Sequence, residues 1–466
     1  MNLKQIFSTI EIVVIQRLLF SRTQRAKRRL AWLFLGRGIH MEKGYWKKIS
    51  MSVLFCALLL SGCSKSGVSQ GTAEKTQADS LKGRSSGSEK NAGAAKAKVI
   101  DENHSISGMP EEKLDLSEYG LGYQGAADAR PEYLWMSAAR AENGYYVWGK
   151  ASERSGRGML MYFDKASKSY IPLCNKPNCA HNSKGCNADF NSNGEEEVKY
   201  IRSYIQYYDG CVYVAGHDEE GYVYLYKVAP DGSTCEKYMT LYKADLSSTA
   251  EGENVKEFSE PEICIHRGYI YFMVGKESNL KLRRMELGGE DVEIVFENAG
   301  SRPSLYRMKA YGDYLFFQSG NFTDDDCIDI KAGIFALNVN TAKTQLVKKD
   351  AVSDYTVSDG DLYYTTAVGI NRYSLKKQED AAVVETGVRG DVAVHGKFIY
   401  FYRDDTCTLS QYDSGGKLLH EITDADFSPC RMEDEDYFFA LGFGKEGFLP
   451  VKELSKGSAK WTSLEE

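Results

Sequence analysis

Residues 222–242 read YVYLYKVAPDGSTCEKYMTLY. Two runs rich in tyrosine, valine and leucine lie on either side of Pro230-Asp231-Gly232. β-Branched and aromatic residues favour strands, and the sequence proline, aspartate, glycine favours a tight turn. The stretch therefore predicts two antiparallel strands joined by that turn.

A short motif that precedes this stretch returns along the chain. It consists of a turn residue, usually glycine, then one variable position and three apolar or aromatic residues. Successive copies begin 36 to 66 residues apart, and repeats of roughly 40–50 residues are typical of β-propeller blades. The seven copies begin at Gly144, Gly210, Gly268, Gly312, Gly360, Gly396 and, without the glycine, Glu435.

These repeats predict an all-β fold, a β-propeller over residues 115–466. A single repeat cannot bury both faces of its sheet, so neighbouring repeats must stack, and closing the ring removes exposed edges. Seven copies favour seven blades, and six is the alternative if one copy is not a blade. A pair of β-sandwich domains is a second alternative. The last repeat is short, so we expect residues 133–136 (YLWM) to supply the strand that closes the ring.

The N-terminal region predicts export. In residues 41–65, three lysines lie near the start, between residues 43 and 48. An apolar stretch follows over residues 49–60, which is too short to span a bilayer. It ends in Leu60-Ser61-Gly62-Cys63, where small residues precede a cysteine.

This ending resembles the lipobox of bacterial lipoprotein signal peptides. The resemblance implies that Cys63 is diacylated on its sulfur and becomes the mature N-terminus. Residues 41–63 are thus predicted to be a lipoprotein signal peptide, and residues 1–40 an upstream extension before a start at Met41. A twin-arginine signal at residues 25–29 is the alternative, but the apolar run after it is short.

Residues 64–114 are predicted to be a disordered tether. Residues 64–98 are rich in serine, glycine, alanine and lysine and carry a net charge of +4, which suits an anionic membrane surface. Residues 1–63 hold 11 basic and 2 acidic residues, so the remaining chain has a net charge of −16, compared with −7 for the whole sequence. An acidic body is repelled by phosphate backbones, so nucleic acid is not an expected partner.

One segment carries a candidate metal or disulfide site. Cys174, Cys179, His181 and Cys186 follow the pattern C-x4-C-x-H-x4-C in the longest gap between repeats. Three thiolates and one imidazole would suit a structural zinc ion, although the spacings differ from the usual C-x2-C. In an oxidising compartment two of the cysteines would instead form a disulfide. Unpaired thiols are the third alternative.

No residue is predicted to be catalytic or to bind an organic cofactor. The other cysteines lie at positions 211, 235, 264, 327, 407 and 430, and those in strand-like runs are predicted to be small buried residues. Zinc at the Cys/His segment is therefore the one cofactor that the sequence suggests.

The lipobox, the basic tether and the tandem hairpins together resemble a group of poorly characterised Gram-positive surface lipoproteins with TolB-like or YWTD-like propellers. The C-x4-C-x-H-x4-C segment is similar to a segment of some of these proteins. The resemblance covers residues 41–466 and implies export and a propeller fold, but no established activity.

We therefore expect a protein that is lipid-anchored to the extracytoplasmic face of the cell membrane through Cys63 and binds a protein, peptide or carbohydrate. A hydrolase or lyase with its active site in the central channel is the alternative. An accessory subunit of an envelope transporter is the third option. Convergent carboxylates or a histidine in the channel would favour the enzyme, and a ring of neutral aromatic residues would favour binding.

Overall fold

The computed structural model describes much of the chain from residue 97 onward. The chain divides into two compact units, residues 1–86 and 87–466, and every described residue belongs to the second. The described residues are 97–101, 106–116, 138–150, 158–181, 185–190, 204–217, 220–244, 262–276, 278–300, 303–322, 330–349, 353–403, 405–424, 427, 436–440, 445–454, 456 and 459–464.

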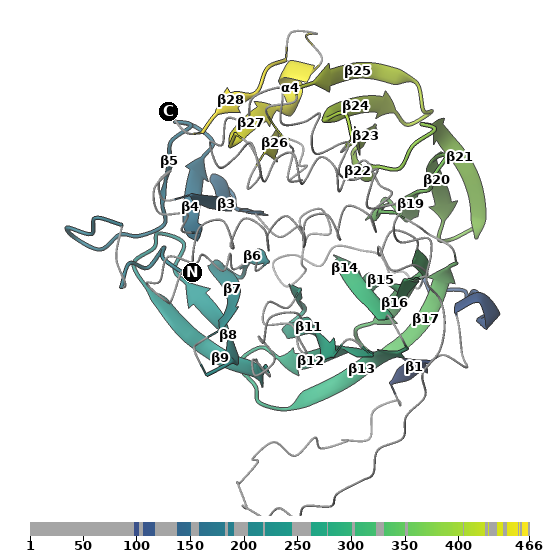
Figure 1. The fold of residues 1–466 in the computed structure, drawn as a ribbon, viewed down its shortest axis with the longest axis horizontal. Coiled ribbons are helices and arrows are strands. Elements are labelled where there is room, and N and C mark those ends of the chain that lie inside the picture. Colours follow the sequence, from purple (N-terminus) through teal and green to yellow (C-terminus); the bar gives the residue numbers. More distant parts are fainter. Residues whose placement is uncertain are drawn as a thin grey trace, which may run out of the picture. The chain divides into compact units, whose positions relative to one another are not determined.

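The strands of this unit form seven small sheets arranged in a ring, which confirms the predicted seven-bladed β-propeller (Figure 1). Blade 1 contains β2 (Ala138–Arg140), β3 (Gly144–Lys150), β4 (Gly158–Asp164) and β5 (Tyr170–Pro172). Blade 2 contains β6 (Ile205–Tyr208), β7 (Cys211–His217), β8 (Tyr222–Val228) and β9 (Cys235–Lys243). Blade 3 contains β10 (Ile263–His266), β11 (Tyr269–Lys276), β12 (Asn279–Glu286) and β13 (Val292–Ala299), with β1 (Lys98–Ile100) as a fifth strand.

The remaining blades follow in chain order. Blade 4 contains β14 (Pro303–Tyr311), β15 (Tyr314–Phe322), β16 (Ile330–Asn338) and β17 (Lys343–Lys348). Blade 5 contains β18 (Tyr355–Ser358), β19 (Asp361–Thr365), β20 (Gly369–Ser374) and β21 (Glu379–Glu385). Blade 6 contains β22 (Asp391–His395), β23 (Phe398–Arg403), β24 (Thr408–Asp413) and β25 (Leu418–Thr423). Blade 7 contains β26 (Tyr437–Ala440), β27 (Gly447–Pro450), the short helix α4 (Val451–Leu454) and β28 (Thr462–Ser463).

In blades 2 to 6 the glycine that opens the sequence motif lies in the turn between the first and second strands, whereas in blade 1 Gly144 is the first residue of β3. In blades 2, 3 and 5 both central residues of this turn have positive φ, as in Asp209 (45°) and Gly210 (72°). Type I′ hairpin turns require that conformation, and glycine adopts it without steric cost. In blades 1 to 6 the motif therefore forms the second strand and the first strand precedes it, while in blade 7 it forms β26, the first strand described there.

Apolar side chains between the blades form the core. Among the described residues, seven hydrophobic clusters occur, and each joins one pair of neighbouring blades, including blade 7 and blade 1. A closed ring has this pattern, whereas two β-sandwiches would have two separate cores. Figure 1 shows β6, β14 and β22 facing the centre and β9, β21 and β25 at the rim.

In the described part of the chain, side chains close the ring. The sheet of blade 1 contains only strands from the N-terminal end of the ring, and that of blade 7 only strands from the C-terminal end. Tyr145 lies 5.0 Å from Phe439, and Phe163 lies 4.9 Å from Phe448, between ring centroids. The expected closing strand at residues 133–136 lies outside the described residues.

Part of the segment predicted as a tether is packed against the propeller. β1 pairs in parallel with β13, and the 3₁₀ turn η1 (Ile106–Gly108) follows. Ile100, Ile106 and Leu114 are all buried, on blades 3 to 5. Within the predicted range 64–114, the described residues from 97 onward are thus folded onto the ring.

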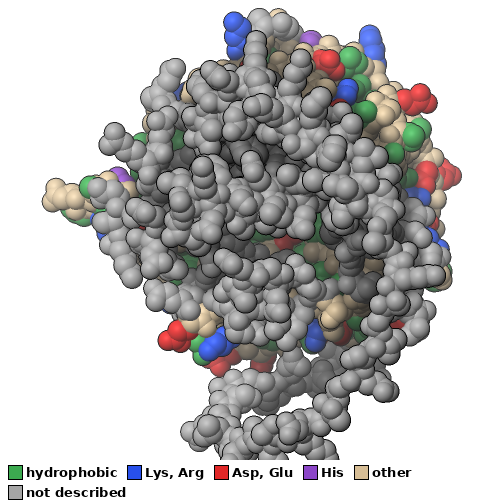
Figure 2. All heavy atoms as spheres, in the orientation of Figure 1, with side chains coloured by type: hydrophobic (Ala, Val, Ile, Leu, Met, Phe, Trp, Pro, Cys, Tyr) green, Lys and Arg blue, Asp and Glu red, His purple; other side chains and the backbone are tan. Residues whose placement is uncertain are grey.

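The predicted signal peptide and Cys63 lie outside the described residues. Among the helices that the structure describes, none has the length and apolar character needed to cross a bilayer. Figure 2 shows acidic and basic side chains side by side around the rim of the visible face.

Candidate metal centre

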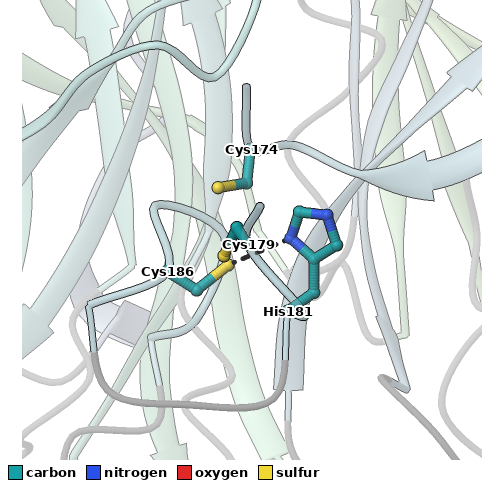
Figure 3. A group of neighbouring side chains, drawn as sticks. All are labelled: Cys174, Cys179, His181 and Cys186. Carbon is teal, nitrogen blue, oxygen red and sulfur yellow. Dashed lines mark hydrogen bonds between the residues drawn. The ribbon is translucent and has the colours of Figure 1, made fainter. Parts of the chain in front are cut away.

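The structure brings Cys174, Cys179, His181 and Cys186 together in the segment after β5 (Figure 3). The three sulfur atoms and the histidine ring nitrogen lie within 4.8 Å of one another. The Nδ1 atom of His181 lies 3.4 Å from the Sγ atom of Cys186. Cys186 is buried, and the other three residues are half-buried.

Tight backbone turns fold this segment back on itself. Asn178 (φ 60°), His181 (φ 54°) and Gly185 (φ 105°) all have the left-handed conformation, which is uncommon for residues with a side chain. The Lys176 ammonium donates to the carbonyl oxygen of Gly185 over 2.5 Å and joins the two arms of the loop. Non-glycine residues with positive φ cluster at functional sites, where the surrounding structure holds them in place.

The returning arm of the loop extends the edge of blade 1. Asp189 forms an isolated antiparallel bridge with Met159, and the Leu160 amide donates to the carbonyl oxygen of Ala188 over 2.9 Å. Cys186 and Ala188 belong to the hydrophobic cluster between blades 1 and 7. The loop is therefore attached to the sheet of blade 1 and to the junction between blades 1 and 7, which we call the seam of the ring.

Two of the thiols have opposite pKa shifts. Burial raises the pKa of the Cys186 thiol to about 12. Burial acts in the same direction on Cys174, but hydrogen bonds from the amides of Lys176 and Asn187 and contacts with the other two thiols outweigh it, so its pKa is lowered. Amides that donate to a sulfur atom stabilise the thiolate, which is the form that binds metals.

The described cysteines are all free thiols. Besides the three in the cluster these are Cys211, Cys235, Cys264 and Cys407, while positions 327 and 430 lie outside the described residues. Cys264 is fully buried, as predicted for a small core residue, whereas Cys211 is half-buried.

The contact between the loop and blade 2 could not be predicted from the sequence. Asn187 donates through Nδ2 to the carbonyl oxygens of Gly232 (2.8 Å) and Ser233 (2.9 Å). The amide of Asn175 donates to the same Gly232 oxygen over 3.1 Å. Gly232 belongs to the turn between β8 and β9, so a turn identified for its backbone conformation also receives the Cys/His loop.

A second polar cluster lies on the inner strands, and we call it the inner ring. Its members each stand five residues before the first central residue of the turn that ends the first strand of their blade. By strand pairing these positions are equivalent and lie at one level around the axis, except in blade 4, where the bulge in β14 puts Tyr306 at that position and Arg307 directly after it. The inner ring consists of Tyr204, Glu262, Arg307, Asp354 and Asp391, from blades 2 to 6 in order.

Arg307 links the acidic members of the inner ring. Its guanidinium lies 3.3 Å from Asp354 and 3.9 Å from Asp391, and both of these carboxylates are buried. A bulge in β14 places Arg307 at φ 60°. Its own amide donates to Glu262 over 2.9 Å.

The acidic side chains of the inner ring also bond the backbone of the next blade. Glu262 accepts from the amides of Arg307 and Met308, and Asp354 accepts from the amide of Val392 over 3.0 Å. Burial raises the pKa of Glu262 to about 7, although these amides, the Tyr204 hydroxyl and the Arg307 charge all act to lower it. The carboxylates thus tie blade 3 to blade 4 and blade 5 to blade 6.

Sequence reasoning left the residues of the channel open. The usable signal was the distance from the turn, because Glu262 and Asp354 both stand six residues before the motif glycine. Arg307 stands five residues before its motif glycine, Gly312, at the β14 bulge, so its contacts with Asp354 and Asp391 in the next two blades could not be predicted from that count.

Comparison with known proteins adds no assignment. No family model matches the chain, and no curated protein matches it. Among solved structures, a putative 6-phosphogluconolactonase from Bacteroides fragilis is similar, with 11% identity and a TM-score of 0.41, over 68% of this chain and 93% of that one. TolB from Acinetobacter baumannii has 11% identity and a TM-score of 0.35, over 60% and 63% of the two chains. BamB from Moraxella catarrhalis has 10% identity and a TM-score of 0.32, over 65% and 80%.

These likenesses are too distant to carry a conclusion about activity or partners. The propeller fold follows from the strand pairing and the seven inter-blade cores of this chain itself.

Proposed function

We propose that this protein is a lipid-anchored extracytoplasmic binding module whose propeller presents a site for a protein, peptide or carbohydrate. The observation that carries the proposal is the bonding of the inner-ring carboxylates. Convergent carboxylates in the channel are what a hydrolase or lyase would need. Glu262 and Asp354, however, already accept hydrogen bonds from the backbone of neighbouring blades, which is a structural role. For Glu262 and Asp354 this bonding argues against a role as free acid or base, and the binding module is proposed on that ground.

Binding is tested by site-specific photo-cross-linking in intact cells. Four exposed apolar residues on different blades offer positions for a photoreactive amino acid: Val99, Ile171, Val368 and Leu418. We expect a discrete cross-linked product at one or two of them that is competed by excess soluble protein. Equal, non-competed labelling at all four, or no product at any, would contradict a defined binding surface.

The anchoring half of the proposal depends on Cys63. We expect Cys63→Ala to abolish incorporation of labelled fatty acid and to release the protein from the membrane fraction. Cys56→Ala is a matched control, because Cys56 lies in the apolar stretch of the same signal segment. Retention of the label by the Cys63→Ala variant would overturn the lipobox interpretation.

We further propose that Cys174, Cys179, His181 and Cys186 hold a structural zinc ion. With bond lengths of about 2.3 Å to sulfur and about 2.0 Å to nitrogen, a tetrahedral zinc site sets sulfur and nitrogen about 3.5 Å apart. The 3.4 Å separation of His181 Nδ1 and Cys186 Sγ matches this distance. A disulfide would use two of the sulfur atoms and would give no role to the third sulfur or to the imidazole.

Metal analysis of the purified full chain, combined with thiol counting, tests the zinc site. We expect about one zinc per chain, lost in Cys186→Ser and kept in Cys407→Ser, because Cys407 is a half-exposed cysteine outside the cluster. A chain without metal whose cluster contains a disulfide by mass spectrometry would overturn the proposal.

A further inference from the structure

We infer that the Cys/His loop is a metal-dependent clasp, in which zinc binding is coupled to docking of the loop on the β8–β9 turn of blade 2. This inference rests on the zinc site proposed above and adds a role for it. The clasp consists of residues 173–181 and 185–189 of the loop and residues 230–233 of the turn.

The coupling follows from where the docking contacts lie in the loop. Asn175 directly follows the first ligand, Cys174, and Asn187 directly follows the last ligand, Cys186. Both asparagines bond the same carbonyl oxygen, that of Gly232. Because each contact is one residue from a ligand, an ion that fixes the ligands also fixes the contacts.

The turn approaches the loop closely at Gly232. A Cβ atom added to this residue would lie 2.5 Å from the carbonyl carbon of Leu173 and 2.6 Å from the backbone nitrogen of Cys174. These backbone atoms cannot move without moving the first ligand. Only glycine therefore allows the loop and the turn to adopt this arrangement together.

The opposite side of the loop is attached to the seam of the ring. Cys186 and Ala188 pack in the cluster that contains Tyr437 and Phe439 of blade 7, and Ala188 bonds β4 of blade 1. A metal ion in the loop would thus connect blade 2 to the blade 1–blade 7 seam. Within the described residues this seam contains side-chain packing and no shared strand.

A pair of glycine variants tests the coupling without removing a ligand. Gly210 lies in the same blade, in a turn with φ 72° against 71° for Gly232, but a Cβ atom there would meet nothing within 4 Å. Gly232→Ala and Gly210→Ala therefore carry the same backbone penalty and differ in the contact with the loop. Zinc affinity is measured on the full chain by competition with a chelator.

We expect Gly210→Ala to leave zinc affinity unchanged and Gly232→Ala to weaken it about tenfold, within the usual range of coupling between two sites. Asn187→Ala is a milder variant that keeps every ligand and removes two of the docking bonds, and we expect it to weaken affinity in the same direction. It keeps the test decisive if Gly232→Ala fails to fold.

Hydrogen exchange gives an independent readout. We expect zinc to slow amide exchange in both the loop and residues 231–233 of the wild type, and to leave exchange in residues 231–233 unchanged in Gly232→Ala. If zinc binds but neither the variants nor the turn respond, the clasp is wrong and the zinc site stands. If the wild type binds no zinc, the site itself is wrong.

Discussion

The inner ring and the Cys/His loop both gather ionisable side chains, but they satisfy them differently. In the inner ring, Glu262 and Asp354 accept hydrogen bonds from backbone amides of the next blade, and Arg307 offsets part of the buried negative charge. In the loop, the amides that reach the sulfur of Cys174 belong to the loop itself, and the four donor atoms approach one another (Figure 3).

Structural polar groups and ligand-binding ones differ in what satisfies them. Buried polar atoms need partners. Where the protein backbone supplies them, as in the inner ring, the group holds the fold together. Where donor atoms of metal-ligand type lie close together, as in the Cys/His loop, the partner that we propose for them is an ion.

The largest effect is expected from Arg307→Ala. It would leave Asp354 and Asp391 buried without their cationic partner, which typically costs about 3–5 kcal/mol of unfolding free energy. Arg403→Ala is the control, because Arg403 pairs with the exposed Asp405 at the surface and is expected to cost less than about 1 kcal/mol. Urea denaturation measures both. Equal losses in the two variants would mean that the inner ring is not a buried network.

The next effect is a pH dependence from Glu262. Its pKa is raised from 4.5 to about 7 in the folded protein, so the folded state holds a proton that the unfolded state loses between these values. Stability should therefore fall as pH rises from 4.5 to 7, by a contribution on the order of 3 kcal/mol. Glu262→Gln cannot titrate and should lack this part of the slope. A slope identical to that of the wild type would assign the pH dependence to other groups.

The smallest effect concerns the Cys/His loop, whose contribution to stability should depend on bound metal. With zinc at about 100 times its dissociation constant, binding to the folded state adds about 2.7 kcal/mol of stability. We expect Cys179→Ser to lose this increment in the presence of zinc and to match the wild type within about 0.5 kcal/mol after chelation. Arg307→Ala should be equally destabilised in both conditions. A loss in Cys179→Ser that persists without zinc would make the cysteine a packing residue.

The architecture was accessible from the sequence because each blade repeats a local signal. Gly210, Gly268 and Gly360 occupy turn positions that require positive φ. The steric requirement of the turn therefore appears in the sequence as a recurring glycine. The Cys/His segment was accessible because its signal is also local: its four candidate ligand residues lie within thirteen consecutive positions.

What remained hidden depends on contacts between blades. Asn187 and Gly232 are 45 residues apart, and nothing in either residue type indicates the other. Arg307 and Asp391 meet only because the inner strands converge at the axis. The contacts of residues 97–101 and 106–116 with the ring were also hidden, because isolated residues such as Ile100 and Leu114 carry no periodic pattern.

The parallel pairing of β1 with β13 determines where mechanical load would enter the molecule. Any tension along the chain upstream of Lys98 would be applied in shear to the three paired positions on blade 3. Residues 106–116, which are held on blades 3 to 5 by Ile106 and Leu114, would take it up next. These contacts would bear the tension before blade 1 and its junction with blade 7, and so would protect that junction from a pull at the N-terminal side.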